Sequence, residues 1–169
     1  MPSVSKPPVR VIGLGSLFRG DDAFGPRVVE TLRAGWEFPA GVVLTDAGTP
    51  GLDLMVLLSD CRHAVLVDAV KGGGEPGQVR RFSRGEAIGP SPTARLSAHS
   101  LDLRETLLLL ETTGQAPESV TLVGVEPQRL EAGIGLTPPV GDAVPEAAKA
   151  VVDRLVEIGF PPTRRTGLR

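Results

Sequence analysis

The most constraining feature of the sequence is the alternation of short apolar runs with amphipathic segments, joined by connections rich in Gly, Pro and Asp. This alternation predicts βα units, whose helices cover both faces of a largely parallel sheet. We therefore expect a single three-layer, doubly wound α/β domain. Its mostly parallel sheet is predicted to have five or six strands, one of them an antiparallel edge strand. The domain is expected to span residues 9–160, with flexible ends at 1–8 and 161–169.

Five runs are predicted as strands. The run at 64–67 is apolar at every position, which is typical of a strand buried on both faces at the centre of a sheet. The run at 78–82 follows a glycine and carries two arginines that tolerate water, so it is the predicted edge strand. The remaining strands are expected at residues 9–14, 42–45 and 120–125.

The clearest predicted helix lies near the C-terminus, with Asp142 as its cap and Gly159 as its stop. Its apolar stripe consists of Val144, Ala147, Ala148, Val151, Val152 and Leu155. A shorter helix is expected over residues 51–58, with Thr49 as the cap and Pro50 at the first helical position.

Two further helices are predicted by the same spacing of apolar residues. One follows the first strand, has Pro26 in its first turn and stops at Gly35. The other covers residues 101–111. Together these helices supply the two outer layers of the predicted fold.

Potential metal ligands follow the predicted strands. Asp22 lies in the loop after the first strand, Asp68 directly follows the central strand, and His99 stands just before the third helix. In open α/β sheets, the loops at the carboxyl ends of the strands meet at the functional crevice. Two carboxylates and one imidazole suit a borderline divalent cation such as Ni²⁺, Zn²⁺ or Co²⁺, and would leave coordination positions open.

The same rule also selects Asp21, Asp46 and Glu126, and each candidate has a structural alternative. Paired Asp residues before a helix, such as Asp21 and Asp22, commonly act as caps or as partners of the helix dipole. An Asp that ends a buried strand, such as Asp68, often accepts hydrogen bonds from loop amides. The alternative for Glu126 is that Pro127 after it simply fixes an extended exit from the strand. His99 has the alternative of being an ordinary surface histidine.

Three other signals are weak. The sequence GLGSLF at residues 13–18 begins like a dinucleotide-binding motif, but Phe18 stands where the third glycine belongs. Ser16 lacks the G-x-S-x-G pattern of a serine hydrolase. Cys61 and His63 precede the central strand, so they are expected at its amino end, away from the crevice.

Composition excludes several classes of protein. With 169 residues, of which 41% are apolar, the chain suits one core. A net charge of -2 provides no field for holding a nucleic acid. The opening residues MPSVSKPP lack the apolar run of an export signal, and no stretch approaches the length that crosses a membrane. The single cysteine cannot form an internal disulfide. We therefore expect a cytoplasmic protein.

Five segments, taken in order, resemble the motifs of the hydrogenase maturation protease family. The sequence VIGLGSLFRGDDAFGPRVV at 11–29 resembles the family pattern G-x-G-N-x-x-x-x-D-[DE]-[GA]-x-G. It departs from the pattern at Ser16, where Asn is usual, and Ser100 stands where Gln often follows the histidine. The other segments are DAGTPGL at 46–52, AVLVDAV at 64–70 running on to EPGQ at 75–78, SAHSL at 97–101, and VGVEP at 123–127 followed by LTPPV at 136–140.

The resemblance implies an endopeptidase that removes the C-terminal extension from a nickel-loaded [NiFe] hydrogenase large subunit precursor. The family's metal-binding positions fall on Asp22, Asp68 and His99, the same three residues selected by the strand ends. We expect these residues to recognise nickel carried by the substrate, with Asp22 and Asp68 as the catalytic carboxylates. No organic cofactor is expected. Residues that could contact the substrate backbone are Gly48, Thr49, Gly51 and Glu126, although the three from 48 to 51 also suit a turn.

The expected partner is thus the large subunit precursor, and not a nucleic acid or a membrane. The free protein is expected to be a monomer. One alternative keeps the three metal ligands but makes the chain a nickel-sensing chaperone that binds the large subunit without cutting it. Another is a nucleotide-binding α/β module, which the missing third glycine weakens.

Overall fold

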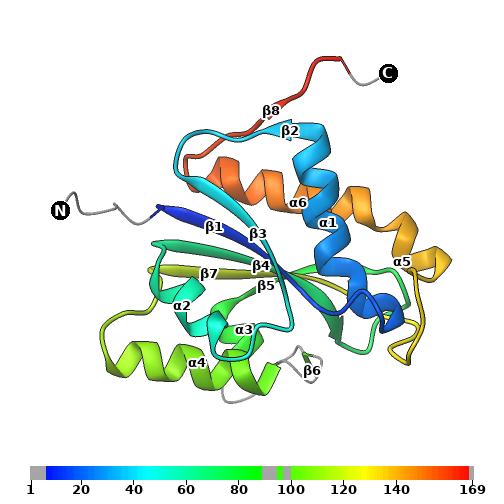
Figure 1. Cartoon of the computed structure of the whole chain (residues 1–169), viewed down its shortest axis with the longest axis horizontal. Coiled ribbons are helices and arrows are strands. Elements are labelled where there is room, and N and C mark those ends of the chain that lie inside the picture. The colour runs from blue at the N-terminus through cyan, green and yellow to red at the C-terminus, as the bar shows by residue number, and fades with distance from the viewer. Residues whose placement is uncertain (1–6, 89–94, 97–99, 168–169) are drawn as a thin grey trace.

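The computed structural model describes residues 7–88, 95–96 and 100–167 (Figure 1). Its centre is a sheet in the order β3-β1-β4-β7-β5, with β6 paired to β4 off this path. Strands β3, β1, β4 and β7 run parallel, whereas β5 runs antiparallel to β7 at the edge. The predicted fold class is therefore confirmed. The strands are β1 (Val9–Leu14), β3 (Val42–Gly48), β4 (His63–Lys71), β5 (Val79–Ser83), β6 (Arg95–Leu96) and β7 (Ser119–Val125).

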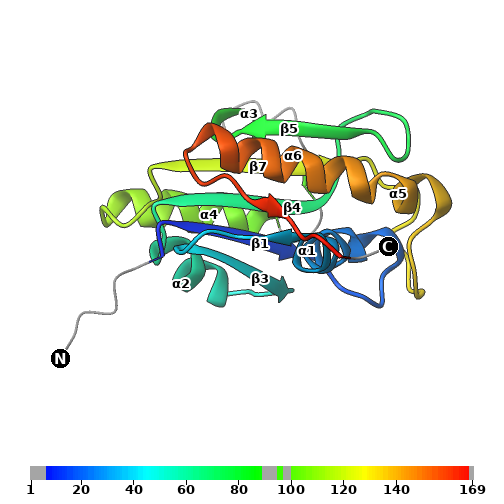
Figure 2. The same cartoon turned by 90° about the horizontal axis from the view of Figure 1, so that it is seen from above.

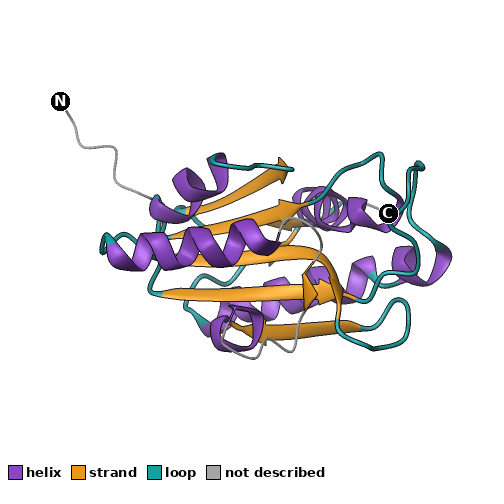
Figure 3. Ribbon diagram, turned by 90° about the horizontal axis from the view of Figure 1, so that it is seen from below, coloured by secondary structure: helices purple, strands orange, loops and turns teal. Residues whose placement is uncertain are grey.

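Helices cover both faces of this sheet, as Figures 1 and 2 show. Helices α1 (Phe24–Gly35) and α6 (Val144–Glu157) pack on one face. Helices α2 (Asp53–Ser59), α3 (Arg84–Ile88) and α4 (Ser100–Thr112) lie on the other, which is turned toward the viewer in Figure 3. The fold therefore has the three layers that the βα pattern predicts.

The alternation of side chains along β4 divides the core in two. Val65 and Val67 belong to the cluster under α1 and α6, whereas Leu66 and Val70 belong to the cluster under α2 and α4. Successive side chains of a strand point to opposite faces, so each cluster takes every second residue. Asp68 has the parity of Leu66 and Val70, which places it on the α2 and α4 face.

Two predicted helix starts are wrong, and the backbone explains both. Helix α2 has Leu52 as its N-cap in place of Thr49. Gly51 has a φ of +53°, a left-handed conformation that cannot belong to a right-handed helix, so the helix begins after it. Asp142 does not cap α6, because the preceding residues form a short helix of their own, α5 (Pro138–Asp142). Ala143 ends α5 and begins α6.

The C-terminal segment departs from the flexible end predicted for residues 161–169. Its strand β8 (Thr163–Arg164) pairs antiparallel with β2 (Trp36–Glu37), which directly follows α1. The Arg164 guanidinium lies 4.5 Å from the centre of the Trp36 ring, a cation-π geometry. At the other end, the carbonyl of Pro8 accepts hydrogen bonds from the amides of Arg62 and His63.

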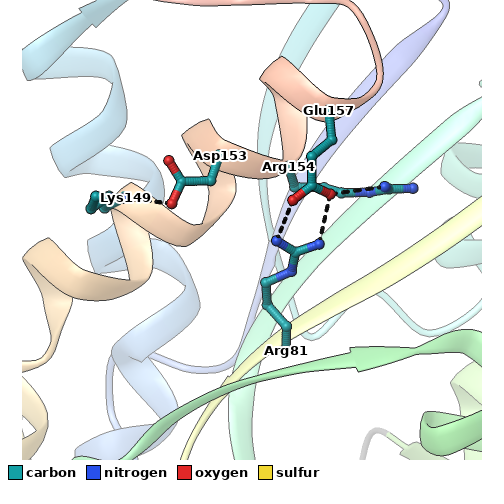
Figure 4. A network of polar contacts seen from close by, with 5 residues as sticks. All are labelled: Arg81, Lys149, Asp153, Arg154 and Glu157. Carbon is teal, nitrogen blue, oxygen red and sulfur yellow. Dashed lines mark hydrogen bonds and ion pairs between the residues drawn. The ribbon is translucent and has the colours of Figure 1, made fainter.

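Charged side chains join the C-terminal end of α6 to the edge strand β5 (Figure 4). Both guanidinium nitrogens of Arg81 donate to the Glu157 carboxylate at 2.8 Å. Arg154 donates to the same carboxylate at 3.1 Å. These ion pairs connect the C-terminal end of α6 to the edge strand at the surface of the protein.

No helix among the described residues is long and apolar enough to cross a membrane.

Candidate functional site

The first loop is packed so tightly that glycine is required at two positions. Gly15 has a φ of +122°, and a side chain carbon there would lie 1.8 Å from the carbonyl oxygen of Asp22. A side chain carbon on Gly25 would lie 2.3 Å from the Leu14 oxygen and 2.5 Å from the Val67 oxygen. The start of α1 therefore packs directly against the ends of β1 and β4. This close packing fixes the position of the loop that joins β1 to α1.

This packing holds Asp22 in a buried position. The residue belongs to a short 3₁₀ helix, η1 (Gly20–Ala23), and is 3% exposed. Its Oδ2 accepts a hydrogen bond from the Ser16 amide at 2.7 Å. The carboxylate is thus oriented by the backbone of its own loop.

Asp68 lies at the same edge of the sheet. It is 2% exposed, and its Oδ1 accepts a hydrogen bond from the Ala69 amide at 2.8 Å. The pairing of β1 with β4 ends at Gly13 and Val67, so Asp68 is the first residue of β4 after the last pair with β1. Because η1 lies against β4, the elements that carry Asp22 and Asp68 are in contact.

The third predicted ligand, His99, lies outside the described residues. The chain on either side of it is placed: β6 pairs with Val70 and Lys71, and α4 begins at Ser100. Among the residues that the structure describes, no group of three His, Cys, Asp or Glu side chains forms a metal site. The three-ligand site stays a prediction.

Asp21 has a role that the sequence did not predict. The side chain is fully buried and points to the loop after β7. Its Oδ2 accepts hydrogen bonds from the amides of Gln128 at 2.9 Å and Arg129 at 2.8 Å. Its Oδ1 accepts from the Thr137 amide at 2.7 Å and from the Thr137 hydroxyl at 2.9 Å. Asp21 therefore ties two loops together across more than 100 residues of sequence, which no local motif could indicate.

Glu126 shapes another loop at this edge. Its Oε2 accepts hydrogen bonds from the amides of Gly72 at 2.7 Å and Gly74 at 3.1 Å. These bonds hold the connection between β4 and β5. A carboxylate at the end of a strand commonly accepts hydrogen bonds from loop amides in this way. The predicted contact of Glu126 with substrate stays a prediction.

The end of β3 and the turn after it, residues 46 to 51, lie beside the first loop. The Gly15 amide donates to the carbonyl of Gly48 at 2.8 Å, and Asp46 Oδ1 accepts from the Gly48 amide at 3.1 Å. Side chain carbons on Gly48 and Gly51 would meet open space. Thr49 is exposed at the tip of this turn. The predicted contact of this turn with a substrate stays a prediction.

Cys61 and His63 lie at the amino end of β4, as expected. Cys61 is buried, with its Sγ 3.6 Å from the Leu58 oxygen. His63 Nδ1 lies 2.8 Å from the Ser119 hydroxyl, and burial lowers the pKa of its imidazole below 6.5. Neither residue is near the carboxylates at the opposite edge.

The fold and the two buried carboxylates define a single-domain α/β protein with its candidate site at the carboxyl edge of a parallel sheet. Comparison with known proteins identifies its family. The family model described as hydrogenase maturation protease matches residues 26–154. The chain belongs to this family.

Individual relatives cover most of the chain. The hydrogenase 2 maturation protease of Escherichia coli strain K12 is 34% identical, over 89% of this chain and 92% of that protein. The hydrogenase expression/formation protein HoxM of Cupriavidus necator is 34% identical, over 94% of this chain and 75% of that protein. The structure of the hydrogenase maturating endopeptidase HybD from E. coli superposes with a TM-score of 0.86 at 32% identity, covering 94% of this chain and 98% of that one.

Proposed function

We propose that this protein is a cytoplasmic endopeptidase that removes the C-terminal extension from a nickel-loaded [NiFe] hydrogenase large subunit precursor. Nickel is part of the substrate in this reaction, and it is recognised by Asp22, Asp68 and His99. The observation that carries the proposal is the placement of two buried carboxylates on contacting elements, η1 and β4, in a chain of the maturation protease family.

The chemistry of these groups fits recognition of a metal in the substrate. Carboxylate and imidazole ligands bind borderline divalent cations such as Ni²⁺. Docking would be favourable only when the precursor already carries its metal, since the cation supplies the attraction to the two carboxylates and the imidazole. A cation at the cut site would polarise the scissile carbonyl or lower the pKa of a bound water that attacks it. Asp22 or Asp68 would accept a proton from this water and pass it to the leaving nitrogen as the C–N bond breaks.

The proposal is tested by incubating the purified protein with the precursor, prepared with and without nickel, and measuring the precursor mass. We expect a C-terminal peptide to be released from the nickel-loaded form alone. Asp22→Asn and Asp68→Asn should each lower the cleavage rate about 100-fold, the effect of losing one charge-stabilising group. The matched control is Asp153→Asn, which changes a partly exposed carboxylate on α6, where it pairs with Lys149.

Two outcomes would contradict the proposal. If either variant keeps more than a tenth of the wild-type rate, the carboxylates do not have the assigned role. If the protein binds the nickel-loaded precursor but leaves its mass unchanged, the protein is a nickel-sensing chaperone.

A further inference from the structure

Three apolar side chains are exposed close to the candidate site. Leu17 is 44% exposed, Phe18 is 71% exposed and Ile134 is 80% exposed. Leu17 and Phe18 belong to the loop that ends in Asp22, and Ile134 belongs to the loop between β7 and α5. Exposed apolar groups that gather beside a functional site commonly mark a surface that binds another molecule.

The backbone holds these side chains in place. Arg19 and Gly133 form a parallel bridge, with Phe18 and Ile134 one residue to either side of it. The Gly133 amide donates to the Phe18 carbonyl at 3.0 Å, and the Gly20 amide donates to the Gly133 carbonyl at 2.9 Å. Figures 1 and 2 show the two loops, one blue and one yellow, side by side. Phe18 and Ile134 are therefore presented to solvent by a preformed scaffold.

Two arginines border the apolar side chains. A side chain carbon on Gly133 would lie 3.4 Å from the Arg129 guanidinium, so this cation sits over the joined loops. Arg19 and Arg129 are both exposed, and neither forms an ion pair within the described ranges. We call Leu17, Phe18, Arg19, Arg129 and Ile134 the rim patch. Aromatic residues and arginine are the types enriched at protein interfaces and among their strongest contributors.

The rim patch is continuous with the candidate site. Phe18 lies four residues before Asp22, and the Phe18 amide bonds to the hydroxyl of Ser16, whose own amide bonds to Asp22. Asp21 fastens Arg129 to the same loop. A folded protein whose C-terminal segment reaches Asp22 would therefore come close to this patch.

We infer that the rim patch is the docking surface for the folded body of the precursor, an inference that rests on the proposed function. The matching surface of the partner has an apolar hollow that receives Phe18 and Ile134, and carboxylates at its border that face Arg19 and Arg129. The patch thus supplies binding energy away from the cut site. Its residues affect how tightly the precursor binds and leave the chemical step unchanged.

The inference is tested by steady-state cleavage of nickel-loaded precursor with the double variant Phe18→Ser, Ile134→Ser. We expect KM to rise about tenfold or more, with kcat within about twofold of wild type. The charge reversal Arg19→Glu, Arg129→Glu should also raise KM. For wild type, KM should rise with added salt, and this dependence should weaken in the charge variant.

The matched control is Leu108→Ser, Val156→Ser, which removes two exposed apolar side chains away from the patch. Val156 lies at the far end of α6, next to Arg154, which bonds to Ser119 at the start of β7. This control should keep the wild-type KM. Melting temperatures of all variants show whether each one is folded.

Each other outcome overturns the inference. An unchanged KM in the folded Phe18→Ser, Ile134→Ser variant would mean that the patch does not bind the precursor. A wild-type dimer in analytical ultracentrifugation that becomes monomeric in this variant would mean that the patch binds a second copy of the chain. If the wild type cleaves no precursor, the proposed function itself has failed, and the two failures are thereby distinguished.

Discussion

Charged side chains at the two ends of the parallel strands differ in their burial and in their partners. At the carboxyl end, Asp21, Asp22 and Asp68 are buried and accept hydrogen bonds from backbone amides. At the amino end, Arg154 bonds to Ser119 at the start of β7, and Glu157 pairs with Arg154 and Arg81 in contact with water. Buried carboxylates bonded to the backbone fix the geometry of loops, whereas exposed ion pairs contribute little because water and salt screen them. The comparison indicates which end is built for a function.

The largest effect on stability is expected from Gly15→Ala, which disturbs the closest packing at the carboxyl end. The added methyl group would overlap the Asp22 carbonyl, and the positive φ is unfavourable for alanine. We expect the free energy of unfolding to fall by about 4 kcal/mol, measured by urea denaturation.

Gly35→Ala is the matched control for this prediction. Gly35 ends α1 with open space around it, so alanine should change stability by no more than about 1 kcal/mol. Equal losses in the two variants would show that the close approach at Gly15 is not what holds the first loop.

The next effect is expected from Asp21→Asn. The new NH2 group would face either the amides of Gln128 and Arg129 or the amide of Thr137, and in both cases a backbone donor loses its acceptor. We expect a loss of about 3 kcal/mol in the free energy of unfolding. Asp46→Asn, in which a single exposed bond is altered, should cost less than about 0.5 kcal/mol. A comparable loss in both variants would remove the distinction between buried and exposed carboxylates at this end.

The smallest effect is expected at the amino end, and it depends on pH. Hydrogen bonds from Arg81 and Arg154 lower the pKa of Glu157 from 4.5 to about 2. Because the folded pKa is the lower one, the stabilisation is present above pH 4.5 and is lost as the pH falls toward 2. The difference in stability between wild type and Glu157→Gln should shrink over this interval, and added salt should reduce it at neutral pH.

Thermal melts at several pH values measure this difference, with Glu30→Gln as the control for a local pair within α1. A difference that persists at pH 2 would mean that packing of the Glu157 side chain, and not its charge, matters. A loss larger than that of Asp21→Asn would reverse the comparison between the two ends.

Much of the sheet could be predicted from the sequence, because the strands that build its core are continuous apolar runs. The run at 64–67 indicates a central strand, and β4 indeed lies between β1 and β7. Its extension to Lys71 was missed because Asp68 resembles a strand end. In the structure Asp68 stays in the strand, where it is paired with Gly124 of β7.

Features that depend on distant partners could not be predicted. Thr163–Arg164 forms a strand only because Trp36–Glu37 offers an edge, and nothing in the C-terminal sequence indicates this pairing. Asp21 finds its donors more than 100 residues away. The strand-end rule did place Asp22 and Asp68 on elements in contact, because that rule depends on topology and not on long-range bonds.

The carboxylate of Asp21 has a mechanical consequence for the whole edge. By bonding to Arg129 and Thr137 at once, it joins the loop after β7 and the loop before α1 into one rigid unit. If either loop moved away from the other, a buried carboxylate and several backbone amides would lose their hydrogen bonds together. Each loop therefore fixes the position of the other.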